Sequence, residues 1–428
     1  MQETTVTDYE EGQLLAGIRV LDLTRVWSGP LAGRILADLG AEVIHIVGRS
    51  TISSASITPE TARLMGVFPE NDPGQRPWDR RSTDNDFHRN KLGLTLELNT
   101  PEGADLFKRL AKVSDVVLEN FSPRVMSNFG LDYVTLRSIN PGMILCSMPG
   151  YGLTGPYRDY VSYGTNLDPF SGLASLMGYP GEGAHMSGNA YPDPAAALHA
   201  VGAILTALFH KQHTGQGQQI DLSQAESATC LIGETVLGYA LNRKVPARRG
   251  NRHPVFSPQG CYRCQGEERW VAIAVSTEAQ WQALCRVMGH PEWVGDKRFS
   301  EPAERYLHQD ELDELIGFWA GQYPQYEVMG LLQQAGVPAG AVLDAADLLN
   351  DAHLHERAFF IEVDHPESGP GKYCSLPIKF SDTPAFPSRP APCLGEHNTY
   401  ILNKILGLSP EEITRLQENN IIGTVPID

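Results

Sequence analysis

Residues 17–152 alternate short runs of β-branched and aliphatic side chains with segments of helical periodicity. Residues 18–23 form the first run, residues 30–39 follow with a helical pattern that ends at Gly40, and residues 42–47 form the next run. Strands that alternate with helices at this spacing build βαβ units, whose strands pair in parallel. The alternation therefore predicts an α/β fold, with a Rossmann-like large domain around a parallel sheet.

Later segments extend this pattern. Residues 94–98, 116–118 and 143–146 are predicted as further strands, and Thr100 followed by Pro101 is typical of a helix start. Residues 49–85, by contrast, are rich in Ser, Thr, Pro, Asp and Asn and have no clear period. A segment of this kind predicts a long loop that is functional or disordered.

The chain has 428 residues, which suffices for two or three domains. A dense basic run at residues 242–253 marks a change in composition and suits either an interdomain linker or a phosphate contact. The predicted division has four parts along the chain. These are the first part of the large domain (14–226), a linker (227–253), a smaller α+β domain (254–335) and a C-terminal part that returns to the large domain (336–428).

The charge and cysteine content restrict the partners. A net charge of −17 disfavours nucleic acid and anionic membranes, so an anionic substrate would need a local basic pocket. Cys261 and Cys264 form the one C-x-x-C pair among seven cysteines, and no second pair completes a metal site. No metal, reduced thiols, no membrane segment and a cytoplasmic location are expected.

Asp193 lies between two prolines at the start of a strongly apolar helical pattern that ends at Gly215. We expect Asp193 to be the N-cap, with Pro194 in the first helical position, which keeps the carboxylate ionised. Taken alone, such an Asp is usually only a cap. The common nucleotide, dinucleotide, zinc-protease and serine-hydrolase motifs are missing from the sequence.

Several segments, in order, resemble the class III CoA-transferases, the CaiB/BaiF group typified by formyl-CoA transferase. The matching segments are residues 21–26, 29–30, 36–44, 90–91, 100–103, 119–123, 150–156, 172–173 and 214–218, with weaker matches at 336–338 and 394–398. The resemblance implies an interlocked homodimer in which each chain threads through the other. It also implies a coenzyme A thioester as substrate, with no permanently bound cofactor.

In that family the catalytic carboxylate precedes the long apolar helix, and the matching residue here is Asp193. The positions expected to bind substrate or CoA are Trp27, Ser28, Arg49, Asn120, Phe121, Arg124, Tyr163 and Gly164. Three of these residues depart from the family pattern. Gly164 stands where the formyl-CoA transferases have an acidic residue, and Trp27 stands where formyl-CoA transferase has a glutamine. Tyr163 stands where the related α-methylacyl-CoA racemases have a histidine. The departures argue against formate or oxalate as the acid. Asp168 could replace the missing carboxylate, although a turn before Pro169 is the simpler interpretation.

These features predict a CoA-transferase that moves CoA from an acyl-CoA donor, with succinyl-CoA as a candidate, to a small carboxylic acid. An ionised Asp193 needs no general base to attack a thioester, and an aspartyl anhydride and an aspartyl-CoA thioester would follow. One alternative is an acyl-CoA racemase or isomerase on the same fold, although residue 164 supplies no second base. The other is a non-catalytic CoA-binding subunit of a heteromeric transferase.

Overall fold

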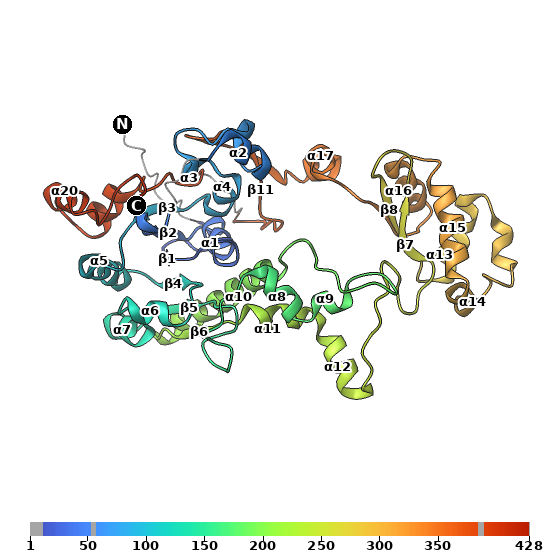
Figure 1. Cartoon of the computed structure of the whole chain (residues 1–428), viewed down its shortest axis with the longest axis horizontal. Helices are drawn as coiled ribbons and strands as arrows, with labels where there is room; N and C mark the ends of the chain where they lie inside the picture. Colours follow the sequence, from blue (N-terminus) through green and yellow to red (C-terminus); the bar gives the residue numbers. More distant parts are fainter. Residues whose placement is uncertain (1–11, 53–56, 384–388, 428) are drawn as a thin grey trace. The chain divides into compact units, whose positions relative to one another are not determined.

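The computed structural model describes residues 12–52, 57–383 and 389–427, and the chain forms two compact units (Figure 1). The larger unit comprises Met1–Leu173, Met186–Val236 and Glu356–Asp428, and the smaller unit comprises Ala174–His185 and Leu237–His355. The C-terminal part from Glu356 onwards belongs to the larger unit. The expected boundary at 336 was wrong, because the chain stays in the smaller unit until His355.

The larger unit is built on a six-stranded parallel sheet with the order β3-β2-β1-β4-β5-β6. Its strands are β1 (Arg19–Asp22), β2 (Glu42–Val47), β3 (Leu92–Thr95), β4 (Val116–Glu119), β5 (Ile144–Ser147) and β6 (Gln219–Asp221). The strand order reverses between β1 and β4. In open α/β sheets, ligands bind in the crevice at this switch point, outside the carboxyl ends of the strands.

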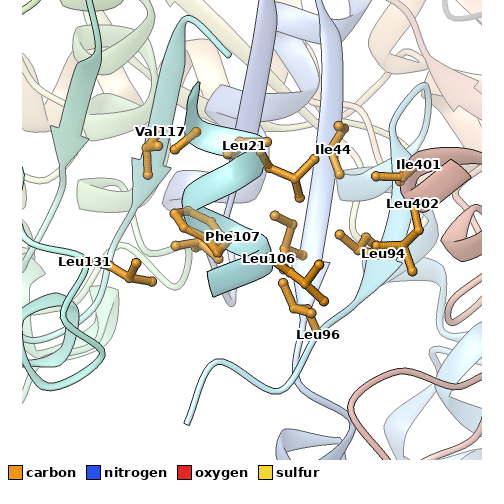
Figure 2. Packing of buried hydrophobic residues seen from close by; sticks show 14 of the residues in the cluster. Leu21, Ile44, Leu94, Leu96, Leu106, Phe107, Val117, Leu131, Ile401 and Leu402 are labelled. Atoms are coloured by element: carbon orange, nitrogen blue, oxygen red, sulfur yellow. The ribbon is translucent and has the colours of Figure 1, made fainter. Parts of the chain in front are cut away.

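Helices cover both faces of this sheet, and the aliphatic runs seen in the sequence become strands with little exposure to solvent. The helices up to β5 are α1 (Ser28–Asp38), α2 (Pro59–Met65), α3 (Pro77–Arg80), α4 (Ser82–His88), α5 (Pro101–Lys112), α6 (Arg124–Asn128) and α7 (Tyr133–Ile139). Figure 2 shows one core, in which Leu21, Ile44, Leu94 and Phe107 pack together with Ile401 from the C-terminal part.

Residues 49–85 are more ordered than predicted. The described part of this segment contains α2, α3 and the start of α4, together with two 3₁₀ turns at Arg49–Thr51 and Pro69–Asn71. The helices are too short to show a hydrophobic period, which is why the sequence pattern indicated a loop. A local signal was nevertheless present, because Thr58 caps α2 through its side chain and Pro59 takes the first position.

Five helices lie between β5 and the sheet of the smaller unit, and most of their residues belong to the larger unit. They are α8 (Gly164–Phe170), α9 (Leu173–Leu176), α10 (Pro192–Thr214), α11 (Gln224–Thr229) and α12 (Gly233–Asn242), with a 3₁₀ turn at Cys230–Ile232. The 3₁₀ turn thus separates α11 from α12. Among the described helices, α10 alone is long and apolar enough to cross a membrane by length and composition, contrary to expectation. More than half of that stretch is buried, and Ala196, Ala200 and Ile204 pack in the core, as in a soluble protein's central helix.

The C-terminal part closes the free edge of the sheet at β3. The ring Nδ1 of His397 accepts a hydrogen bond from the Gly93 N–H (3.1 Å), and the Asn398 side chain accepts one from the Thr95 N–H (2.9 Å). Unpaired edge groups invite association with other chains, so these two side chains protect the strand. The other C-terminal elements of this unit are β10 (Phe360–His365), β11 (Gly369–Cys374), α19 (Asn398–Tyr400), a π-helical turn at Ile401–Ile405 and α20 (Pro410–Glu418).

The smaller unit contains a three-stranded antiparallel sheet with the order β7-β8-β9, as an α+β domain requires. Its elements are β7 (Gln259–Arg263), β8 (Trp270–Ala274), α13 (Glu278–Met288), a 3₁₀ turn (Pro291–Gly295), α14 (Pro302–Leu307), α15 (Gln309–Ala320), α16 (Gln325–Gln334), β9 (Ala339–Ala341), α17 (Ala345–Asn350) and α18 (Ala352–Glu356). Trp281 is fully buried at the centre of its core. All seven cysteines of the chain are free thiols.

Candidate functional site

Asp193 is the second residue of α10, and its side chain is only 6 % exposed. The prediction that it is the N-cap was wrong by two positions, because Tyr191 occupies the cap and Pro192 the first turn. Asp193 Oδ1 accepts a hydrogen bond from the backbone N–H of Ser28 (3.3 Å), the first residue of α1. The carboxylate therefore lies at the N-terminal ends of two long helices, where the backbone N–H groups favour negative charge.

Burial has the larger effect on the ionisation of this group. It raises the pKa of Asp193 to about 6, and the hydrogen bonds from the Ser28 and Asp193 N–H groups offset part of that rise. At neutral pH most of the carboxylate is still ionised. A partly desolvated carboxylate with few hydrogen bonds is a better nucleophile than a fully hydrated one.

Gly164, the first residue of α8, lies directly against this carboxylate. A Cβ atom at residue 164 would come 1.7 Å from Asp193 Oδ2 and 2.6 Å from the Ala190 Cβ, so any side chain would have to displace one of them. An acidic side chain at residue 164 does not fit this arrangement of the site. The absence of a side chain at residue 164 is thus coupled to the position of Asp193.

A cavity of about 210 Å³ opens beside Asp193 at the switch point of the sheet. It is formed by the loops after β1, β4 and β5, by the start of α8 and by the first turn of α10. Its lining residues are Arg25, Val26, Ser28, Asn120–Pro123, Pro149, Gly150, Arg158, Tyr160–Gly164, Leu167, Asp193 and Gln224. Six predicted residues meet here: Ser28, Asn120, Phe121, Tyr163, Gly164 and Asp193.

Asn120 holds the loop after β1 in place. Its side chain accepts a hydrogen bond from the Arg25 N–H (2.9 Å) and donates one to the Arg25 carbonyl (2.8 Å). The next residue, Val26, has φ = 71°, which is strained for a β-branched side chain. Such strain persists only where the surroundings enforce it, and it is common at functional sites. The two hydrogen bonds from Asn120 to Arg25 thus help to fix the position of Ser28, two residues after Val26.

Three predicted residues lie outside this cavity. Arg124 lines a neighbouring cavity on the other side of Pro123. Trp27 instead stacks on Phe87, with ring centroids 5.9 Å apart. The predicted CoA contact of Arg49 is not supported, because its buried guanidinium donates to the carbonyls of Val425 (2.6 Å) and Ile422 (3.0 Å).

Asp168 does not replace the missing acid. Its carboxylate accepts hydrogen bonds from the N–H (3.1 Å) and hydroxyl (2.9 Å) of Ser187, and it does not line the cavity. Two lining cations, Arg25 and Arg158, were not predicted as site residues. Arg25 follows β1 directly, where the loop position could have indicated it. Arg158 stands in an irregular loop with no signal of its own.

Asp22, His45 and His88 each place a potential metal-ligating atom within 4.8 Å of the others. The Lys91 Nζ atom lies 2.7 Å from Asp22 Oδ2 and 3.3 Å from His88 Nδ1. Burial opposes ionisation of Asp22, but the Lys91 ammonium outweighs it and lowers the pKa of Asp22. The ammonium already supplies the positive charge that a metal ion would bring, so we assign this cluster to an ion-pair network.

The fold and the cavity define a doubly wound α/β enzyme whose ligands enter at the carboxyl edge of the sheet. The sequence profile of "CoA-transferase family III" matches residues 15–398, and the chain belongs to this family. It is 32 % identical over 414 residues to a succinyl-CoA–D-citramalate CoA-transferase of Chloroflexus aurantiacus (95 % of this chain, 98 % of the relative).

Two further comparisons support the assignment to this family. The alpha subunit of a succinyl-CoA–L-malate CoA-transferase of Chloroflexus aurantiacus is 32 % identical over 409 residues, covering 95 % of this chain and 92 % of that protein. A crystal structure of a CaiB/BaiF family protein from Brucella suis superposes with a TM-score of 0.79 and 29 % identity, covering 92 % of this chain and 100 % of that one. The predicted family, fold class and enzyme class are confirmed. The residue roles and the interlocked dimer stay predictions.

Proposed function

We propose that this CoA-transferase exchanges CoA between two small carboxylic acids, with Asp193 as the covalent nucleophile and succinyl-CoA as a donor. The observation that carries the proposal is the Asp193 carboxylate, which is buried and fixed by the Ser28 N–H at the switch point of the sheet. The succinyl-CoA-dependent relatives support the choice of donor.

In the first half-reaction, a carboxylate oxygen of Asp193 attacks the thioester carbonyl, the C–S bond breaks and CoA leaves as the thiolate. The product is a mixed anhydride between Asp193 and the acyl group. The thiolate then attacks the aspartyl carbonyl, which releases the donor acid and leaves an aspartyl-CoA thioester. The Ser28 N–H, at the start of α1, is placed to stabilise the oxyanion at the aspartyl carbonyl.

In the second half-reaction, the acceptor carboxylate attacks the aspartyl-CoA thioester, and the thiolate leaves again. The thiolate then attacks the acceptor's carbonyl in the new anhydride. This step forms the new acyl-CoA and returns Asp193 as a carboxylate. No proton needs to be removed from the nucleophile, so the site requires no histidine beside Asp193.

The racemase alternative is less consistent with this site. Moving a proton at an α-carbon needs two acid–base groups on opposite faces. Among the described residues that line the cavity, Asp193 is the one carboxylate, and no histidine is present. The relative that is an alpha subunit supports a heteromeric assembly as the second candidate.

The test is Asp193→Asn, which keeps the size of the side chain and its acceptor for the Ser28 N–H. We expect transfer to fall at least about 1,000-fold, with circular dichroism and CoA binding retained. With wild-type enzyme and succinyl-CoA, hydroxylamine should convert Asp193 to a hydroxamate that peptide mass spectrometry locates. The matched control is Asp168→Asn, since Asp168 lies outside the cavity and binds Ser187. An Asp193→Asn enzyme that stays active without deamidation would contradict the covalent mechanism.

A further inference from the structure

A second cavity of about 460 Å³ adjoins the cavity that contains Asp193. Arg25 and Val26 line both cavities, so the strained loop after β1 forms their common wall. The second cavity lies against β2 and β3 and is covered by α3, α4 and residues 391–395. Its size is within the range of small-molecule sites.

The wall of this cavity holds polar atoms with no hydrogen-bond partner among the described residues. They are His45 Nδ1, Trp78 Nε1 and Arg81 Nε, and all three atoms are buried. A buried polar atom without a partner costs free energy, and such atoms are rare in proteins. Arg81 Nε still has Asp84 as an ion-pair partner, so the His45 and Trp78 atoms are the ones that indicate a polar ligand. Val47, Ile52 and Leu94 supply apolar surface for its carbon chain.

Arg25 adds a positive charge that forms no ion pair with the described residues, although the Asp22 carboxylate favours its charged form. Its Nη1 donates to the carbonyls of Leu23 (3.2 Å), Thr24 (3.0 Å) and Ile46 (3.2 Å), and its Nε and Nη2 make no hydrogen bond with the described residues. Burial lowers the pKa of Arg25 to about 10, so the guanidinium remains charged at neutral pH. A buried cation without an ion pair is costly unless an anion joins it.

The other charged groups around the cavity already have partners. Asp79 accepts from Arg76 Nε (2.6 Å) and from the Leu394 N–H (2.8 Å). Asp84 and Arg81 form a looser pair, 3.6 Å apart. Among the described lining residues, Arg25 is the cation without an ion pair, so the charge that the cavity lacks is negative.

We propose that the second cavity receives the far end of a dicarboxylic substrate and that Arg25 binds its second carboxylate. One carboxyl carbon, as thioester or free acid, then reacts at Asp193 while the other carboxylate contacts the free N–H groups of Arg25. The Trp78 Nε1–H is a further donor for that carboxylate. This inference rests on the proposed function and specifies its substrate class.

The test compares succinyl-CoA with butyryl-CoA, which has the same chain length and the same CoA but lacks the second carboxylate. We measure kcat/KM for both donors with one acceptor in the wild type, Arg25→Gln, Arg25→Lys and Trp78→Phe. Losing a hydrogen bond to a charged group costs about 10- to 100-fold. We expect Arg25→Gln to lower the succinyl-to-butyryl ratio by that factor, with smaller losses for Arg25→Lys and Trp78→Phe. Arg137→Gln, on an exposed residue of α7, is the matched control and should leave the ratio unchanged.

The ratio of kcat/KM for succinyl-CoA to kcat/KM for butyryl-CoA distinguishes this proposal from other roles of Arg25. If Arg25 acted on the loop in general or on the CoA phosphates, its replacement would lower kcat/KM equally for both donors, and this result would overturn the proposal. A succinyl-to-butyryl ratio near one in the wild type would also overturn it. Calorimetric titration with succinate and with butyrate gives a readout without turnover, in which the wild type should bind succinate more tightly and Arg25→Gln should not. If no acid accepts CoA, the proposed function fails, while the titration still tests the second cavity.

Discussion

At the residue scale, the space around Asp193 is the property most open to test. Gly164→Ala places a Cβ where Asp193 Oδ2 now lies. We expect kcat to fall at least about 100-fold, because a displacement of about 1 Å at a reacting group has an effect of this size. Initial rates of transfer measure it.

The control is Gly202→Ala in the middle of α10, where a new Cβ meets no atom within 4 Å. That variant should keep full activity and gain up to about 1 kcal/mol of stability, since alanine favours helices over glycine. A fully active Gly164→Ala enzyme would show that the carboxylate can move without loss.

The raised pKa of Asp193 predicts how activity depends on pH. The nucleophile is the ionised form, so kcat/KM should increase about tenfold per pH unit below pH 6 and level off above it. A profile that stays flat between pH 5 and 7 would contradict an unprotonated Asp193 as the reacting form.

The same shift affects stability, with the opposite dependence on pH. Because the folded protein binds this proton more tightly than the unfolded chain does, the contribution of Asp193 to stability decreases as pH rises from about 4 to 6. We expect Asp193→Asn to be more stable than the wild type at pH 7, by on the order of 2 kcal/mol. The difference should shrink below pH 5, which urea unfolding at both pH values measures.

At the residue scale, the sequence identified individual candidate residues but not their contacts with distant parts of the chain. The Pro-Asp-Pro step identified Asp193, but its exact position in the helix was ambiguous because either proline suits a first turn. The contact between Gly164 and Asp193 joins residues 29 positions apart, and no local pattern encodes it. The structural contacts of Arg49 could not be predicted, because its partners lie more than 370 residues further along the chain.

At the scale of elements, Arg49 links the end of β2 to the C-terminal segment. Its guanidinium donates to two backbone carbonyls, the buried one of Ile422 and that of Val425. We expect Arg49→Ala to destabilise the protein by about 2–4 kcal/mol, because these carbonyls lose their donor. The KM for CoA donors should change little. Urea unfolding and steady-state kinetics test both statements, and an increase in KM at unchanged stability would restore the CoA-binding role.

The elements that were predicted correctly are those with a repeated pattern. Strands buried on both faces require continuous aliphatic runs, so β2, β4 and β5 appeared directly in the sequence. The helices α3 and α4 have four and seven residues, fewer than a period needs to show. Packing of α4 against α1 and α3, rather than a pattern of their own, defines them.

At the scale of the whole molecule, α12 supports the predicted dimer. None of its residues is buried, and Val236, Leu237, Tyr239 and Leu241 are large exposed apolar side chains. A helix of this kind usually contacts another chain. We expect light scattering to give about twice the chain mass of 46.9 kDa at micromolar concentration. Val236→Glu with Leu241→Glu should favour the monomer, and an active wild-type monomer would contradict the dimer.

The division of the chain was only partly predictable. The change in composition near residue 242 lies close to Leu237, where the chain enters the smaller unit for the second time, whereas the short excursion at Ala174–His185 had no signal in the sequence. The final return to the larger unit was placed about 20 residues too early, because β9 has three small residues, Ala339–Ala341, without a strand pattern. Its place in the smaller unit comes from pairing with β8.

The protection of β3 by His397 and Asn398 has a consequence for synthesis on the ribosome. The strand ends at Thr95, yet its two protecting side chains are translated about 300 residues later. At roughly 5–20 residues per second, the open edge waits at least about 15 seconds for them. The nascent chain therefore carries a parallel sheet with an unpaired edge at β3 through most of its translation, a period in which holdase chaperones would be needed most.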